Sequence, residues 1–127
     1  MQSHSLGKSG EAQCMQYLLD RNYKILQQNF RSPYGEIDII AKDRQYLVFK
    51  EVKTRATSNL DKAKWDITYS KQKKITRTAM CFLSDFNDPE IEEYRFDVMI
   101  LVQSGDEKEI HHLINAFPPA EVGDFCV

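Results

Sequence analysis

Several features that define large protein classes are missing from this chain of 127 residues. Its longest apolar runs are only a few residues, so no membrane-spanning segment is expected. The start of the chain, Met1-Gln2-Ser3-His4-Ser5, lacks the basic and apolar parts of a signal peptide. The cytoplasm is therefore the expected location.

The cysteines and histidines also lack the spacing of a zinc site. The three cysteines include no Cys-x-x-Cys pair, His111 and His112 are adjacent, and His4 is terminal. We expect reduced thiols and no zinc. The Gly7-Lys8-Ser9 tripeptide is not a phosphate-binding loop either, because Gln2 occupies the position of the required first glycine.

Net positive charge, the usual mark of a generic nucleic-acid-binding protein, is absent, since the net charge is −2. That total hides a segregation of charge along the chain. Residues 42–77 carry eleven basic and four acidic side chains, whereas residues 78–127 carry two basic and eleven acidic ones. The middle segment is therefore expected to form a local basic surface, although a solvated helix surface is the simpler explanation of the charge alone.

What the chain does have is a pair of acids in strand-like apolar stretches. Asp38 lies in Gly35-Glu36-Ile37-Asp38-Ile39-Ile40 and Glu51 begins Glu51-Val52-Lys53, with a polar break at 42–45 between them. A hairpin centred between Arg44 and Gln45 places Asp38 opposite Glu51 and Glu36 opposite Lys53, all on one face. Two carboxylates beside a lysine predict a site for a hard divalent cation.

A plain cross-strand ladder of Glu36 with Lys53 is the alternative interpretation. It leaves Asp38 facing Glu51, and like charges placed opposite each other destabilise a sheet. Both acids also stand among apolar residues, where an unpaired charge is costly. A cation between the two carboxylates removes that conflict.

The hydrophobic pattern predicts helices at 10–20 and 70–85, with Ser70 as the cap of the second helix. Strands are predicted at 23–30, 34–41 and 46–54, and a hairpin of two more strands at 94–103 and 109–117. This order indicates an α/β fold with a mixed central sheet of about five strands flanked by helices. We expect one domain over residues 1–127, in which 118–127 form a loosely held tail.

An acid on one strand followed by an acid-x-Lys triplet on the next resembles the PD-(D/E)xK core of restriction-endonuclease-like folds. More narrowly, the chain is similar to the bacterial YraN family, which resembles archaeal Holliday-junction resolvases. The positions that carry the resemblance are Gly7, Gly10-Glu11, Tyr17-Leu18, Tyr23, Ile25-Leu26, Asn29, Arg31, Gly35-Glu36-Ile37-Asp38, Glu51-Val52-Lys53, Arg55, Lys71-Gln72, Ile75 and Arg95-Phe96-Asp97-Val98. Ile37 stands where the superfamily motif has its proline.

The resemblance implies a restriction-endonuclease-like three-layer core and a Mg²⁺ site, in which Mn²⁺ can substitute. Asp38 and Glu51 would be the metal-binding carboxylates, with Glu11 as a third acid and the Val52 carbonyl as a further ligand. Lys53 would orient or deprotonate the attacking water, and Glu36 would support Lys53.

Nucleic-acid contacts are expected from the basic segment. Arg55 and the helical residues Lys71, Gln72, Lys74 and Arg77 would hold the backbone, and the loop at 55–66 would lie over the site. The resemblance implies DNA as the substrate, although the residues do not distinguish DNA from RNA. It also implies a homodimer, which nothing in the residues themselves indicates.

These observations predict a metal-dependent DNA endonuclease, selective for junctions or flaps if it follows the resolvases. Two alternatives stay open: a nucleic-acid-binding module of the same fold without catalysis, and a protein-interaction module that uses the acidic C-terminal half. The sequence is silent on protein partners and on the biological pathway.

Overall fold

A computed structural model describes residues 2–56 and 67–123, with the side chains of residues 2–9 outside the description. The helices are α1 (Gln2–Asp20) and α3 (Tyr69–Asp85). The strands are β1 (Lys24–Ser32), β2 (Gly35–Asp43), β3 (Tyr46–Arg55), β4 (Glu93–Ser104) and β5 (Glu107–Phe117).

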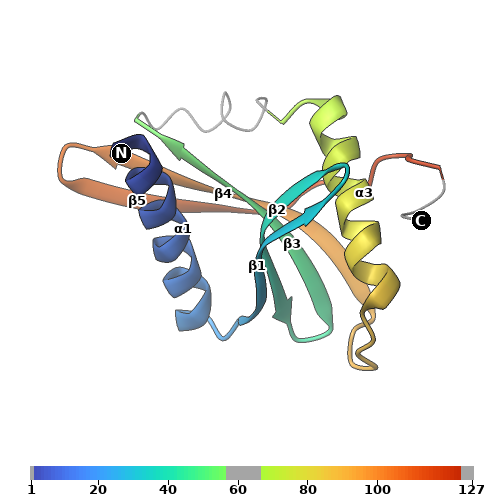
Figure 1. The fold of residues 1–127 in the computed structure, drawn as a ribbon. Helices are drawn as coiled ribbons and strands as arrows, with labels where there is room; N and C mark the ends of the chain where they lie inside the picture. Colours follow the sequence, from blue (N-terminus) through green and yellow to red (C-terminus); the bar gives the residue numbers. More distant parts are fainter. Residues whose placement is uncertain (1, 57–66, 124–127) are drawn as a thin grey trace.

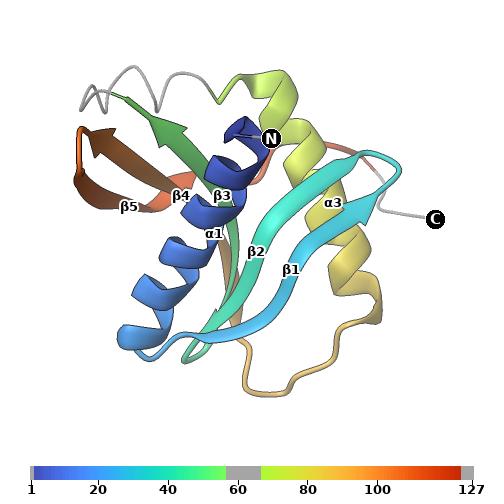
Figure 2. The ribbon, with the colours of Figure 1, turned by 60° about the vertical axis from the view of Figure 1, so that its left-hand side comes forward.

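The five strands form one mixed sheet in the order β1-β2-β3-β4-β5. Neighbouring strands are antiparallel except β3 and β4, which run parallel because the chain crosses between them through α3. The sheet twists strongly, with α1 on one face and α3 on the other (Figures 1 and 2). The predicted three-layer α/β fold of the restriction-endonuclease-like type is confirmed.

The register between β2 and β3 is the predicted one. Ile39 pairs with Lys50, and Ala41 pairs with Val48, around a turn at Arg44 and Gln45. Alternation along β3 directs Phe49 into the core cluster beneath α3 and Val48 into the cluster beneath α1. Successive residues of β3 therefore serve opposite faces of the sheet.

Two local expectations are corrected by the structure, and the loosely held tail at 118–127 stays a prediction. The predicted cap, Ser70, already lies within α3, and Thr68 is the cap, because its hydroxyl accepts the Lys71 N–H at 3.1 Å. Cys14 is free and buried, but Cys81 is disulfide-bonded, so the prediction of three reduced thiols is wrong for Cys81. In the C-terminal segment, the Ala120 N–H donates to Thr76 at 3.1 Å, while residues 124–127 lie outside the description.

Candidate active site

Asp38 and Glu51 lie where the pairing of β2 with β3 ends. The last paired residues are Ile39 and Lys50, and the two acids are the next residues outward on their strands. Beyond this point β3 continues beside β4, where Glu51 pairs with Val98. A side chain replaces the lost strand partner for one backbone group of β3, because the Val52 N–H donates to the Asp38 carboxylate at 2.7 Å. The strands therefore separate at the position of the two acids.

The environment of Asp38 opposes its ionisation. Burial, followed by the negative charge of Glu51, raises its pKa to about 7, against the opposing effect of the Val52 N–H. Glu11 and Glu36 add smaller effects in the same upward direction. A positive charge at this position would relieve the repulsion.

Glu51 has a cationic partner on α3. The Lys71 ammonium, in the first turns of α3, lies 2.6 Å from the Glu51 carboxylate. Glu51 is 9% exposed, whereas the Lys71 side chain is 44% exposed. The lysine thus reaches from solvent to a buried acid and neutralises one member of the pair.

Glu11 approaches the pair from α1 because the helix lies tightly on the sheet beside it. A Cβ at Gly10 would lie 3.0 Å from the Thr54 hydroxyl and 3.2 Å from the Leu101 side chain. Only glycine permits that approach without displacing a neighbour. The half-buried Glu11 is then near enough for its charge to act on Asp38 and on Cys14.

The remaining candidates around the pair have mixed placements. Lys53 is half-buried on β3, two residues beyond Glu51. The Glu36 carboxylate forms a salt bridge of 3.0 Å with Arg31 of β1. The pairing of β2 with β3 ends before it reaches Glu36. The role of Glu36 as a supporting partner of Lys53 stays a prediction.

The expected nucleic-acid contacts divide into separate groups. Lys71 joins the carboxylates, whereas Lys74 and Arg77 lie farther along α3, where the Arg77 guanidinium is 5.4 Å from the centroid of the Tyr34 ring. Gln72 donates from its side chain to the Ile67 carbonyl at 3.1 Å. Arg55 donates to the Thr54 carbonyl at 3.0 Å. Most of the loop expected over the site, residues 57–66, lies outside the described residues.

The donors at the pair fit a hard divalent cation. Mg²⁺ is typically held by one or two carboxylates, with water and substrate phosphate completing the shell. A strand residue directs its N–H and C=O toward the same neighbour, so the Val52 carbonyl faces β2 along with the N–H that meets Asp38. Within residues 10–56 and 67–123, no three Asp, Glu, His or Cys side chains are gathered closely enough to hold one ion. Ligation of a cation by Asp38, Glu51, the Val52 carbonyl and Glu11 stays a prediction.

A second cluster of charges, absent from the sequence predictions, lies on the α1 face of the sheet. Lys50 is buried with its ammonium 2.6 Å from Asp97 and 2.8 Å from His112. Arg95 donates to Asp97 at 3.0 Å and to the Tyr23 hydroxyl at 2.8 Å. Burial raises the pKa of Asp97, but the His112 hydrogen bond, the charge of Lys50 and the hydrogen bonds from Arg95 and Lys50 outweigh it and hold that pKa well below its usual range. The cluster joins β3, β4, β5 and the start of β1 beneath α1.

A signal for this cluster was present in the sequence. Lys50 and Asp97 are charges within apolar strand stretches, and the alternation that places Glu51 on one face places Lys50 on the other. A buried charge requires a partner, so a basic and an acidic residue in two such strands indicate an ion pair.

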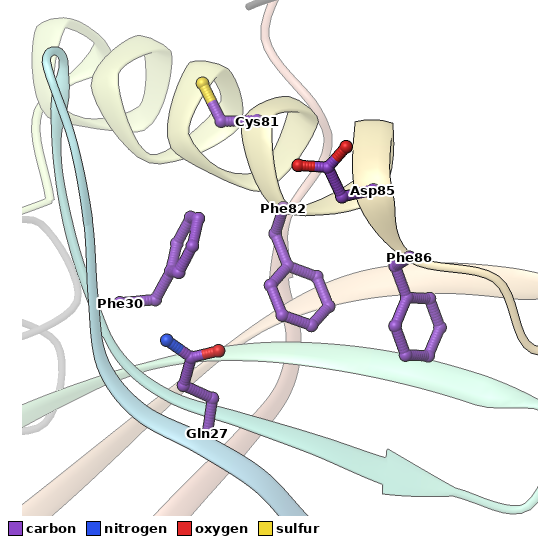
Figure 3. Close-up of a pocket in the computed structure, with 6 residues that line it drawn as sticks. All are labelled: Gln27, Phe30, Cys81, Phe82, Asp85 and Phe86. Atoms are coloured by element: carbon purple, nitrogen blue, oxygen red, sulfur yellow. The ribbon is translucent and has the colours of Figure 1, made fainter.

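An apolar pocket of about 210 Å³ lies between β1 and the C-terminal half of α3. Figure 3 shows the rings of Phe30, Phe82 and Phe86 and the amide of Gln27 around it. None of its lining residues belongs to the candidate site, so we assign it to packing between β1 and α3. Among the described residues, no helix combines the length and apolarity needed to cross a bilayer.

Comparison with known proteins gives a consistent family match. The model of an uncharacterised protein family, UPF0102, matches residues 10–101. A UPF0102 protein of Thermodesulfovibrio yellowstonii is 43% identical over 114 residues, which cover 88% of this chain and 95% of that protein. One from Chlorobium phaeobacteroides is 39% identical over 120 residues, covering 90% of this chain and 94% of that protein. The matched region contains every residue of the candidate site.

Proposed function

The chain belongs to uncharacterised protein family UPF0102, the YraN family that its motifs resemble, and from this premise we propose that it is a metal-dependent endonuclease that hydrolyses DNA. The observation that carries the proposal is the pair Asp38 and Glu51. They lie at a point where two strands separate, partly buried and repelling each other. Two carboxylates that repel each other destabilise the sheet, so stability alone does not explain their placement.

Each neighbouring side chain has a part in the proposed reaction. A divalent cation bound by Asp38, Glu51 and the Val52 carbonyl would supply Lewis-acid polarisation of the scissile phosphate. Lys53 orients the attacking water and stabilises the charge that develops on the phosphate oxygens. Lys71 neutralises Glu51 in the free protein and, because its side chain is partly exposed, can turn to a phosphate when DNA arrives.

A non-catalytic nucleic-acid-binding module is the second candidate. The observation that favours it is the 2.6 Å ion pair of Lys71 with Glu51, which already compensates one of the two carboxylates. In that account the pair of acids and the lysine form a structural link between α3 and β3. The two candidates differ in turnover, so a cleavage assay separates them.

The experiment is cleavage of labelled single-stranded, duplex, flapped and four-way-junction DNA with Mg²⁺ and with Mn²⁺. Wild-type protein is compared with Glu51→Ala, with Asp38→Asn and with the control Glu93→Ala, which removes an exposed acid from β4. We expect cleavage by the wild type and the control, and a loss of at least about 100-fold in both site variants.

Three outcomes contradict the endonuclease. Cleavage that survives in Glu51→Ala at the wild-type rate indicates a contaminating nuclease. Salt-sensitive DNA binding without cleavage on any of the four substrates supports the binding module instead. A protein that neither binds nor cleaves DNA at low ionic strength contradicts both candidates.

A further inference from the structure

A groove beside the candidate site has its own chemistry. Its volume is about 370 Å³, and it lies between the β1–β2 turn and the first half of α3. We call it the α3 groove, and its lining residues are Pro33, Tyr34, Ser70, Lys73, Lys74 and Arg77. The four helical residues are spaced at i, i+3, i+4 and i+7, so they form one stripe along α3.

The wall of the α3 groove formed by the turn is fixed to the helix. The hydroxyls of Ser32 and Thr78 are 2.9 Å apart, and the same Ser32 oxygen accepts the Tyr34 N–H at 3.1 Å. Gly35 follows at van der Waals distance from α3, since a Cβ there would lie 3.5 Å from Thr78. Figure 1 shows the tip of the β1–β2 hairpin lying beside α3. The backbone of Tyr34 is therefore held in place before any ligand binds.

The groove combines cations with aromatic rings. Arg77 lies 5.4 Å from the Tyr34 ring centroid, and Lys73 lies 5.7 Å from the ring of Tyr69, which is 58% exposed. None of the six lining residues is acidic. Cations that follow a phosphate backbone, together with rings and a planar guanidinium on which bases stack, are the ordinary means of binding single-stranded nucleic acid.

The α3 groove and the candidate site are built from neighbouring parts of the same two elements, the β1–β2 hairpin and α3. Lys71, which touches Glu51, belongs to the same stretch of α3 as Lys73 and Lys74. Asp38 lies on β2, three residues after Gly35, which is the first residue of β2 after the turn. A strand lying in the groove would therefore run toward the two carboxylates.

We propose that the α3 groove binds an unpaired strand of DNA, with bases on Tyr34 and phosphates on Lys73, Lys74 and Arg77. The inference rests on the proposed function and specifies its substrate: DNA with a single-stranded segment next to the scissile bond. A duplex engages the groove less well, because its bases are stacked on one another and their faces are not available to a tyrosine ring.

The test is fluorescence anisotropy in EDTA, which prevents turnover, with a labelled single strand and with the blunt duplex of the same sequence. We expect the wild type to bind the single strand at least about tenfold more tightly. Tyr34→Ala should weaken single-strand binding by roughly 5- to 150-fold and leave duplex binding nearly unchanged. Tyr34→Phe keeps the ring and should bind as the wild type does.

Two further variants separate stacking from charge and from folding. Lys74→Ala changes an exposed residue and should reduce the slope of log affinity against log salt by about 0.7, the value for one contact with single-stranded phosphate. Arg21→Ala is the matched control, because Arg21 also stacks on a tyrosine, Tyr17, but at the far end of α1. It should leave binding of either DNA unchanged.

The outcomes distinguish the failure of this inference from the failure of the proposed function. Equal affinity for single strand and duplex, or equal binding by Tyr34→Ala and Tyr34→Phe, overturns the α3 groove as a single-strand site while DNA binding stands. Absence of salt-sensitive binding to either DNA overturns the proposed function and this inference with it.

Discussion

At the scale of single residues, the ionised form of Asp38 is destabilised by burial and by Glu51, and a bound metal ion would remove this destabilisation. Its pKa in the folded protein, about 7, lies above the ordinary value of 3.8. A carboxyl whose pKa is raised in the folded protein makes its full contribution to stability below the pKa of the unfolded chain. This contribution is lost as the pH rises through the pKa of the folded protein. Without metal, the protein should therefore lose stability between about pH 4 and pH 7.

The test is chemical denaturation in EDTA at several pH values. Asp38→Asn should flatten this part of the profile and be more stable than the wild type at pH 8 by about 1–3 kcal/mol. Asp85→Asn, which changes an exposed acid at the end of α3, is the control and should follow the wild type. A wild-type profile for Asp38→Asn would show that Asp38 ionises without cost.

Asp97 predicts the opposite dependence on pH. Its lowered pKa gives stability that is present above the ordinary value of 3.8 and lost as pH falls below it. Asp97→Asn leaves Lys50 and Arg95 without their buried counter-charge, which should cost about 3–5 kcal/mol at pH 7. In urea denaturation, the variant should also lose less stability than the wild type between pH 4 and pH 2. Equal stability of the two proteins at pH 7 would contradict a paired, ionised Asp97.

At the scale of elements, the packing of α1 on the end of β3 positions Glu11. Gly10→Val places a branched side chain against Thr54 and Leu101, which a Cβ alone would already crowd. Overpacking of this kind should cost about 1–3 kcal/mol in the free energy of unfolding. Ala12→Val, at an exposed position of the same helix, controls for helix propensity and should cost about 0.5 kcal/mol. Similar losses in the two variants would mean that the helix can shift freely at Gly10.

The sequence predicts the elements well because their signals are local. The polar break at 42–45 determines the β2–β3 register, which in turn places Asp38 and Glu51 on adjacent strands. The start of α3 is less predictable, since Thr68 and Ser70 are both good caps and the choice depends on where the preceding loop ends.

Long-range contacts were harder to predict from one sequence. The ion pair of Lys71 with Glu51 depends on how α3 crosses the sheet, and that angle leaves no local signal. The same holds for Tyr34 beside Arg77, which are brought together by the bond between Ser32 and Thr78. The partners of Lys50 come from two other strands, Asp97 on β4 and His112 on β5, so a buried charge in the pattern predicts that a partner exists without identifying it.

At the scale of the whole molecule, two described cations of the basic segment 42–77 are paired with acids of the C-terminal half of the chain. Lys42 is paired with Asp88 at 2.9 Å and also with Glu90, so the acidic half of the chain neutralises it. Lys50 is buried against Asp97. On α3, Lys71 contacts Glu51, and Lys73, Lys74 and Arg77 line the α3 groove. A net charge of −2 thus coexists with a basic surface next to the proposed site.

The central claim is that Asp38 and Glu51 hold one divalent cation together, and calorimetric titration with Mn²⁺ tests it most directly. The wild type and the control Glu93→Gln should bind one ion per chain with the same affinity. Asp38→Asn and Glu51→Gln should each weaken binding by at least about tenfold, because each removes one of the two carboxylate ligands. Binding that is unchanged in both site variants, or absent from the wild type, would contradict the claim.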